Sequence, residues 1–197
     1  MFFMKTDLLS ITALESELNR EALPAGVKIV YTGVGKINAS IATYHAIHQH
    51  QPARLINFGT AGKINPQIHG LLEIGTVIQR DMNAEPLAPR GKTPFSHAPV
   101  KYRSHAGIFV CGTGDSFVNG YDQWLHEQKV DLVDMELYAI AAVAHHHQIP
   151  WQSFKYITDD ANADSGKDWQ DKVNHGQALY LAKLEEILRA LWLSCTD

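Results

Sequence analysis

The sequence predicts an α/β fold in which helices cover both faces of a sheet, a three-layer α/β/α sandwich. From Arg54 onward, short β-rich runs that end near glycine alternate with longer stretches of helical period, and this rhythm is typical of such folds. Several strand-like runs are apolar throughout, as strands buried on both faces are. The chain has 197 residues, 45% of them hydrophobic, which suits one compact core. We therefore expect a single domain over residues 1–197.

Local patterns place each expected element. Strand-like runs bounded by polar or glycine-rich turns cover residues 7–12, 27–32, 54–57, 75–80, 108–112 and 153–158. Helical patterns cover residues 36–51, 134–147 and 167–193. The last of these carries leucine and isoleucine near i, i+3, i+4 spacing, which predicts a core or subunit-interface face. Residues 81–104 are rich in proline, glycine and arginine, and this long connection predicts a binding loop, an interface arm or a partly disordered segment.

Composition and charge exclude several classes of protein. The net charge is −4 and Lys and Arg form no dense cluster, which argues against a surface for duplex nucleic acid. Cys111 and Cys195 are too few for a disulfide framework and match no zinc-ligand spacing, so a reducing compartment fits best. The sequence has neither a signal-peptide pattern at residues 1–5 nor a run of about 18 apolar residues. We expect a cytoplasmic protein with no membrane partner.

Three adjacent histidines, His145, His146 and His147, invite a metal interpretation. On a helix, however, they point roughly 100° apart, and they cannot close on one ion without further ligands. A solvated helix end is the better interpretation. The sequence implies no metal and no organic cofactor.

Three glycine-containing motifs follow expected strands, where α/β folds collect ligands. Residues 32–36 form a glycine turn that either admits a ligand to the backbone or is only a tight turn, and they do not match the phosphate-binding pattern GxxxxGK[ST]. Residues 57–62 place small side chains and a hydroxyl where a flat base or sugar fits. Residues 111–118 add Phe117, whose ring stacks on a purine or packs in the core.

Carboxylates mark two further positions. Asp134 and Glu136 lie at the head of an expected helix, and Asp159 and Asp160 lie at the end of an expected strand. Buried carboxylates are costly without a partner, so such positions need a reason. Each also has a simpler explanation, because acids complement a helix N-terminus and Asp caps turns. Taken singly, these residues leave both interpretations open.

Taken together and in this order, the motifs resemble the purine nucleoside phosphorylase and nucleosidase superfamily, most closely its 5′-methylthioadenosine/S-adenosylhomocysteine nucleosidases. The resemblance covers nearly the whole chain and rests on residues 13–17, 32–39, 57–62, 114–118, 134–136 and 157–159. It implies a nucleoside phosphorylase-like sandwich with a central mixed sheet. The implied activity is hydrolysis of the N-glycosidic bond of an adenine nucleoside (methylthioadenosine, S-adenosylhomocysteine or adenosine itself), in nucleoside catabolism such as methionine salvage.

The resemblance also implies roles for the acids. Asp159, rather than Asp160, matches the aspartate that protonates the leaving purine at N7, and Glu17 matches the glutamate that holds the attacking water. Met135 and Glu136 match the pair that packs under the ribose and binds its 2′ and 3′ hydroxyls. Since cleavage passes through an oxocarbenium-like ribose, Asp159 must be protonated when it acts, whereas Glu17 should be ionised.

The remaining contacts implied by the resemblance are with the base and the sugar. Phe117 matches the aromatic residue that stacks on the base, and the backbone of Val118 meets the edge of the base. Thr60, Ala61 and Gly62 would border both the base and the sugar.

The chain departs from the family in several places. Lys155 stands four residues before the expected acid, where an arginine is usual, and lacks the planar fork that can hold a water and a carboxylate together. We still expect Lys155 to contact the substrate. Residues 18–27 form a short connection where the family has an additional pair of strands, and residues 80–95 differ from the best-known members. Tyr156 and Thr158 replace smaller residues, and either narrow the pocket or face away from it.

Two other functions fit the same residues. Phosphorolysis would need basic groups beside the ribose, and Lys36, Lys63 and Arg80 match no recognisable phosphate site. A non-catalytic nucleoside-binding protein would account for Lys155 and the shortened N-terminal half, although retention of all three acids favours an enzyme. Family members form dimers or larger assemblies, so we expect at least a homodimer acting on a small-molecule purine nucleoside.

Overall fold

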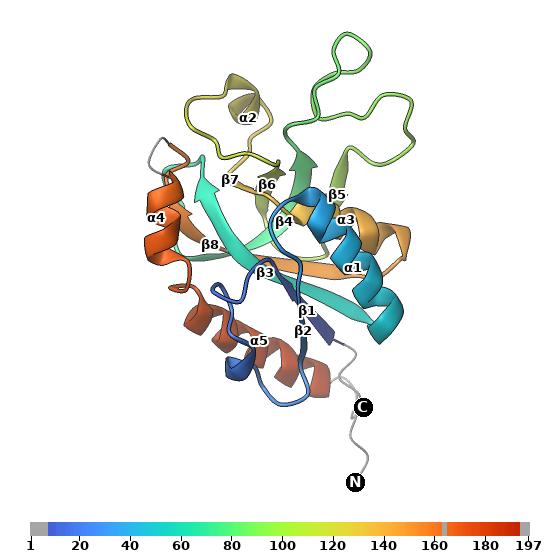
Figure 1. The fold of residues 1–197 in the computed structure, drawn as a ribbon, viewed down its shortest axis with the longest axis vertical. Helices are drawn as coiled ribbons and strands as arrows, with labels where there is room; N and C mark the ends of the chain where they lie inside the picture. The colour runs from blue at the N-terminus through green and yellow to red at the C-terminus, as the bar shows by residue number, and fades with distance from the viewer. Residues whose placement is uncertain (1–7, 163–164, 194–197) are drawn as a thin grey trace.

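The computed structural model describes residues 8–162 and 165–193 and shows a mixed α/β fold (Figure 1). The sheet contains eight strands: β1 (Leu8–Thr12), β2 (Lys28–Tyr31), β3 (Arg54–Lys63), β4 (Leu71–Gln79), β5 (Lys101–Arg103), β6 (Phe109–Thr113), β7 (Leu132–Asp134) and β8 (Trp151–Asp159). The helices are α1 (Lys36–His50), α2 (Gln123–Glu127), α3 (Leu137–His146), α4 (Ser165–Lys172) and α5 (Gln177–Leu193), and a 3-10 turn, η1 (Arg20–Ala22), follows β1. Within the described ranges, no helix is long and apolar enough to cross a membrane.

Part of the sheet closes into a ring. β3, β8, β4, β6 and β7 pair in that order, and β7 pairs again with β3. β1 and β2 extend the sheet from β3 by parallel pairing, and β5 adds to β4 in antiparallel fashion. Parallel and antiparallel pairs occur together, so the expected mixed sheet is confirmed. The three-layer sandwich is not confirmed, because the ladder returns on itself in this part of the sheet.

Glycine lies where the ring bends. β4 pairs with β8 up to Glu73 and with β6 from Ile74, and its register with β6 shifts between Ile74 and Thr76. Gly75 lies in this shift, and a Cβ on it would be 2.4 Å from the carbonyl oxygen of Gly107. The register of β3 shifts in the same way between Ala61 and Gly62, where β7 joins. Irregularities of this kind bend a strand and increase its twist, which lets five strands close.

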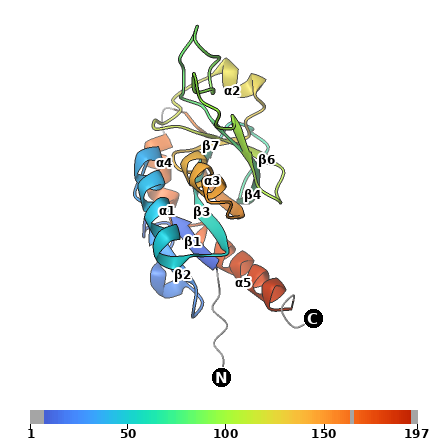
Figure 2. The ribbon, with the colours of Figure 1, turned by 90° about the vertical axis from the view of Figure 1, so that its right-hand side faces the viewer.

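Two apolar clusters lie on opposite faces of the sheet. Leu9 and Leu55 belong to the cluster that includes residues of α1 and α3, whereas Leu8 and Ile56 belong to the cluster that contains Tyr180 of α5. Neighbouring residues of one strand fall in different clusters because successive side chains of a strand point to opposite faces. Figures 1 and 2 show α1 and α3 on one side of β3 and α5 on the other.

Three expected boundaries around the sheet were wrong, and one of them is the start of β4, which lies at Leu71 instead of Gly75. β3 does not end at Asn57 but continues to Lys63, because β8 pairs alongside its small residues. The helix expected from Asp134 begins at Leu137, since Asp134 ends β7 and its carboxylate accepts a hydrogen bond from the backbone N–H of Leu137. β5, β7 and α2 were not expected. The expected first strand begins at Asp7, which lies outside the described residues.

The single helix expected near the C-terminus is two helices, α4 and α5, separated by a turn at residues 173–176. The turn brings Gly176 against Tyr156 of β8, so close that a Cβ on Gly176 would lie 2.5 Å from the ring. Tyr156 therefore faces this turn. The break separates α4, which reaches the cavity described below, from α5, which packs in the core.

The long connection between β4 and β5 is held to the α2 region by Arg90. The guanidinium of Arg90 pairs with the carboxylate of Asp122 at 2.6 Å and lies 4.5 Å from the centre of the Trp124 ring. The same Asp122 caps α2 through the N–H of Trp124. This connection and α2 extend from the end of the molecule away from α5 (Figure 2).

Candidate active site

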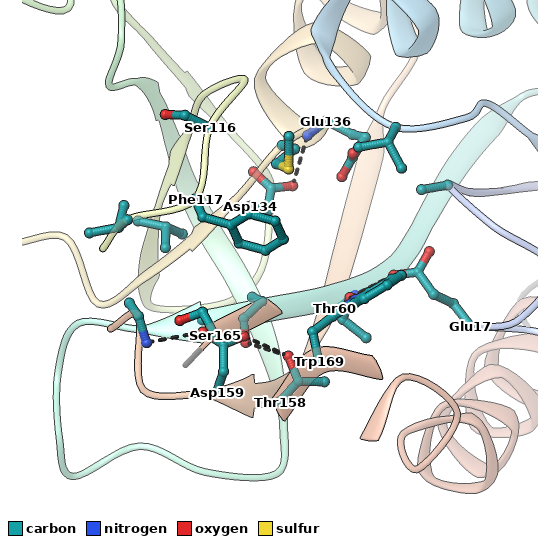
Figure 3. Close-up of a pocket in the computed structure, with 18 of the residues that line it drawn as sticks. Glu17, Thr60, Ser116, Phe117, Asp134, Glu136, Thr158, Asp159, Ser165 and Trp169 are labelled. Atoms are coloured by element: carbon teal, nitrogen blue, oxygen red, sulfur yellow. Dashed lines mark hydrogen bonds between the residues drawn. The ribbon is translucent and has the colours of Figure 1, made fainter. Parts of the chain in front are cut away.

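A cavity of about 300 Å³ opens where β3, β7 and β8 end. The residues expected at the site that line it are Glu17, Thr60, Ala61, Gly62, Phe117, Val118, Met135, Glu136 and Asp159. Glu17, Glu136 and Asp159 are far apart in the sequence but share this one cavity (Figure 3).

Glu17 is buried, 3% exposed, at the wall formed by β3. Its Oε1 accepts hydrogen bonds from the backbone N–H of Thr60 at 2.9 Å and from the Thr60 hydroxyl at 2.7 Å. Its Oε2 accepts one from the backbone N–H of Leu14 at 3.1 Å. A carboxylate that only accepts hydrogen bonds is ready to take a proton from a water in the cavity.

Glu136 lies between β7 and α3, and its Oε1 accepts a hydrogen bond from the backbone N–H of Gly35 at 3.0 Å. Gly35 has φ +94°, which favours glycine, so the glycine turn at residues 32–36 supports Glu136. Burial raises the pKa of Glu136, and the charge of Asp134 raises it further, to about 7, although Lys155 opposes the shift. Glu136 therefore changes charge near neutral pH.

The two aspartates at the end of β8 lie in different environments. Asp159 is 7% exposed; its Oδ2 accepts a hydrogen bond from the Thr158 hydroxyl at 2.9 Å and its Oδ1 accepts one from the N–H of Ala161 at 3.0 Å. Thr158 also lines the cavity. The side chain of Asp160 is 60% exposed and pairs with Lys63 at 2.8 Å. Of the two, only Asp159 lines the cavity.

Phe117 lines the cavity and is half exposed, so its ring is not a core residue. Val118 packs against the small cluster near α2. The turn that presents them is held by Arg80, which is buried and donates hydrogen bonds to the carbonyl oxygens of Gly114 and Ser116. A free face of Phe117 toward the cavity is what stacking on a flat ring requires.

The structure does not place Lys155, expected to contact the substrate, among the residues that line the cavity. Lys155 is fully buried, does not line the cavity, and pairs with Asp134 of β7 at 2.7 Å. Burial opposes the charge of both groups, but their mutual attraction lowers the pKa of Asp134 and raises the pKa of Lys155. The pair links β8 to β7, and both of its charges act on the pKa of Glu136.

Trp169 is a cavity residue that the sequence patterns did not indicate. It lies on α4 and donates a hydrogen bond from its indole Nε1 to the hydroxyl oxygen of Thr60 at 2.8 Å. Its only signal in the sequence is an aromatic residue shortly after Asp159, which is too common a feature to identify a site.

Gly62 gives a test of how Asp159 is positioned. A Cβ on Gly62 would lie 2.5 Å from Asp159 Oδ1, so Gly62→Ala should displace the carboxyl group. Since misplacement by about 1 Å can cost roughly 10²-fold in rate, we expect kcat/KM of a reaction that depends on this carboxyl group to fall at least tenfold with folding retained. Gly166→Ala is the control, because space around Gly166 is open and alanine favours its helix. Equal activity of the two variants would contradict the prediction.

Among the described residues, no group of three or more His, Cys, Asp or Glu side chains is arranged to hold a metal ion. The three adjacent histidines have different neighbours. The His145 ring contacts Tyr102, and the His147 ring contacts His48 of α1, with ring centres 5.0 Å apart. The rings of His146 and His147 are also in contact, with ring centres 5.1 Å apart, because His147 is the C-cap residue that follows α3.

Comparison with known proteins gives consistent matches. The family described as the phosphorylase superfamily matches residues 25–192. A 5′-methylthioadenosine/S-adenosylhomocysteine nucleosidase from Shewanella sediminis is 30% identical over 193 residues, covering 83% of this chain and 84% of the relative.

Two solved structures share the fold. The Helicobacter pylori MTAN-D198N mutant, which has 5′-methylthioadenosine in its active site, superposes with a TM-score of 0.85 at 17% identity, covering 95% of this chain and all of the other. A futalosine hydrolase mutant of the same organism superposes with a TM-score of 0.83 at 16% identity, covering 93% of this chain and 98% of the other. The family match spans most of the sequence, and the chain therefore belongs to the phosphorylase superfamily.

Proposed function

We propose that this protein is a purine nucleosidase that hydrolyses the N-glycosidic bond of an adenine nucleoside. The observation that carries the proposal is the single cavity shared by Glu17, Glu136 and Asp159, with Phe117 at its wall. Relatives named as 5′-methylthioadenosine/S-adenosylhomocysteine nucleosidases support it. We propose that residues 1–197 act as one nucleoside phosphorylase-like domain, in the cytoplasm.

In the proposed mechanism, Asp159 protonates the leaving purine at N7 as the bond between base and ribose breaks. Glu17 takes a proton from the water that attacks the ribose, so that the products are the free base and a ribose that keeps its 5′ group. Glu136 accepts hydrogen bonds from the 2′ and 3′ hydroxyls. The carboxylates also stabilise the positive charge that develops on the sugar ring.

Water, rather than phosphate, is the proposed nucleophile. Of the described residues that line the cavity, Arg80 is the only Lys or Arg, and it donates to backbone carbonyl oxygens. Lys36 pairs with Asp81, and Lys63 pairs with Asp160. A phosphate beside the ribose would need cations that are free to bind it.

The candidate nucleosides differ in the group on the 5′ carbon. Methylthioadenosine, S-adenosylhomocysteine and adenosine are the nucleosides we propose to test first. The fold is also shared by a futalosine hydrolase, so fold similarity does not select among 5′ groups. Futalosine belongs in the same panel.

We propose a homodimer on the basis of the outer face of α1. Ile37, Ile41 and Tyr44 on this helix are 72%, 55% and 46% exposed, and with Val34 they follow helical spacing beside the cavity. An exposed apolar stripe of this kind is typical of an interaction surface. Sedimentation at micromolar concentration tests this part of the proposal, and a monomer would contradict it.

The activity is tested by incubating the protein with the nucleoside panel, with and without phosphate, and separating the products by chromatography. We expect free base and ribose at a rate independent of phosphate. Ribose 1-phosphate would show a phosphorylase instead, and measurable binding without cleavage would show a binding protein.

The pKa of Glu136 predicts how substrate binding depends on pH. An ionised carboxylate accepts both ribose hydroxyls better than a protonated one does. With a pKa of about 7, caused by burial and by Asp134, Glu136 should be mostly protonated at pH 6 and mostly ionised at pH 8. The ionised fraction rises about tenfold across this range, so we expect KM to fall by up to about tenfold. In Glu136→Gln, KM should be high and nearly independent of pH. The same dependence of KM on pH in both proteins would contradict the prediction.

The raised pKa of Glu136 also makes the free energy of unfolding depend on pH. The folded protein holds the Glu136 proton up to about pH 7, whereas the unfolded chain releases it near the ordinary value of 4.5. The contribution of Glu136 to the free energy of unfolding is thus fully present below pH 4.5 and is lost as the pH rises through about 7.

A further inference from the structure

The hydroxyl of Thr60 lies between the aromatic side chain of Trp169 and the carboxylate of Glu17, the proposed general base. Trp169 Nε1 is 2.8 Å from Thr60 Oγ1, and Thr60 Oγ1 is 2.7 Å from Glu17 Oε1. The three side chains come from α4, from β3 and from the segment after β1. Figure 3 shows them as one chain of contacts along the edge of the cavity.

The direction of each hydrogen bond follows from the chemistry of the groups. An indole N–H can only donate, so the Thr60 oxygen accepts from Trp169. An ionised carboxylate can only accept, so the single hydroxyl proton of Thr60 is directed to Glu17 Oε1. The indole therefore fixes the rotation of the Thr60 hydroxyl in the orientation that serves Glu17.

This arrangement distinguishes the two oxygens of Glu17. Oε1 receives both the N–H and the hydroxyl of Thr60, whereas Oε2 receives the N–H of Leu14 at 3.1 Å. Each carboxylate oxygen has two lone pairs. Oε1 is thus filled by Thr60, and the remaining lone pair of Oε2 is the position for the proton of an attacking water.

The indole is held in place by contacts of α4 that do not involve the acids. Lys172, in the last turn of α4, donates a hydrogen bond from Nζ to the carbonyl oxygen of Thr158 at 3.0 Å. At the other end of α4, the hydroxyl oxygen of Ser165 accepts a hydrogen bond from the N–H of Asn162 at 2.8 Å. α4 is therefore tied to the end of β8, and it carries Trp169 at a fixed position over β3.

We propose that Trp169 is a positioning residue, which acts through the Thr60 hydroxyl to hold Glu17 with Oε1 occupied and Oε2 directed to the nucleophilic water. This inference rests on the proposed hydrolysis and adds the assignment of Oε2 as the proton-accepting oxygen. It also gives α4 a role in the reaction, because the position of α4 sets the orientation of the Glu17 carboxylate.

The test is a cycle of substitutions measured by the rate of base release from the best substrate of the panel. Trp169→Phe keeps an aromatic ring and removes the donor, and we expect kcat to fall about 3- to 10-fold with KM within about twofold. Thr60→Val keeps the shape and removes the hydroxyl, and kcat should fall at least about tenfold, because a hydrogen bond to a charged group is lost. Thr60→Ser keeps the hydroxyl and should restore most of the rate.

The double variant separates positioning from a role of Trp169 as part of the wall. If Trp169 acts through Thr60, Trp169→Phe should not slow Thr60→Val further, since coupled residues are non-additive. A full additional loss in the double variant, a rise in KM alone, or wild-type kcat in Trp169→Phe would each overturn the inference. If the wild type releases no base, the proposed function itself fails, which is a distinct result.

A measurement on the folded protein without substrate keeps the inference testable if a Trp169 variant is unstable. The four tryptophans give separate indole N–H signals in a ¹⁵N spectrum, and that of Trp169 should move in Thr60→Val but not in Thr60→Ser. An unchanged signal in Thr60→Val would show that the indole does not bond to this hydroxyl and would overturn the inference.

Discussion

Asp159→Asn is expected to lower kcat by about 10²- to 10⁴-fold, the usual contribution of a general acid. The amide keeps the shape of the side chain and can still accept at one atom from Thr158 or Ala161, so the fold should be retained. It cannot deliver a proton to the departing purine. The rate of base release and the thermal unfolding temperature, measured on the same preparation, separate the loss of chemistry from the loss of structure.

Asp160→Asn is the matched control for this variant. Asp160 is the adjacent residue of the same type, but it is exposed and pairs with Lys63 outside the cavity. We expect its kcat to stay within about twofold of wild type, because exposed ion pairs contribute little. Near-normal turnover in a folded Asp159→Asn protein, or similar losses in both variants, would remove Asp159 from the role of acid.

Lys155→Met should produce the largest loss of stability. Lys155 and Asp134 are each only 1% exposed and lie 2.7 Å apart, so the substitution leaves a buried carboxylate without its counter-charge. Breaking such a pair by removing one partner typically costs about 3–5 kcal/mol in the free energy of unfolding. Denaturant unfolding followed by circular dichroism measures the loss.

Two further variants show whether the unpaired charge is the cause. Asp134→Asn combined with Lys155→Met removes both charges, and this protein should be more stable than Lys155→Met alone. Lys63→Met removes the cation of an exposed pair and should cost less than about 1 kcal/mol. A double variant no more stable than Lys155→Met would indicate that packing, rather than charge, explains the loss.

The Lys155–Asp134 pair also predicts a loss of stability in acid. Burial opposes ionisation of Asp134, but the charge of Lys155 brings the pKa of Asp134 below its ordinary value of 3.8. The unfolded chain therefore takes up this proton at a higher pH than the folded protein does. The contribution of Asp134 is present above pH 3.8 and is lost as the pH falls through the pKa of the folded state.

Much of the fold could be predicted from local patterns. β1, β2, α1, β6 and β8 lie close to their expected positions, because apolar runs and glycine turns mark them in the sequence. β7 has three residues and ends in Asp134, which also reads as the start of a helix. The ring depends on which strands meet at the bends of β3 and β4, and pairing between distant segments leaves no local pattern.

Some of the residues that line the cavity could also be identified from the sequence. Glu17, Glu136 and Asp159 were indicated by the resemblance of the ordered motifs to a known family, since each residue taken singly left its role open. Lys155 and Trp169 are defined by single contacts between elements far apart in the sequence, to Asp134 and Thr60 respectively. A lysine in a strand and a tryptophan in a short helix each occur in many settings, so residue type alone could not assign them.

The closed ring of strands restrains one part of the cavity wall more than it restrains the turn that carries Phe117. β3, β8, β4, β6 and β7 each pair with at least two other strands, so the part of the sheet that carries Asp159 cannot widen unless several of these pairings break. The turn that carries Phe117 lies outside this ladder of strands. We therefore expect changes in ligand size to be accommodated at this turn, where insertions or substitutions should alter selectivity with less effect on the position of Asp159.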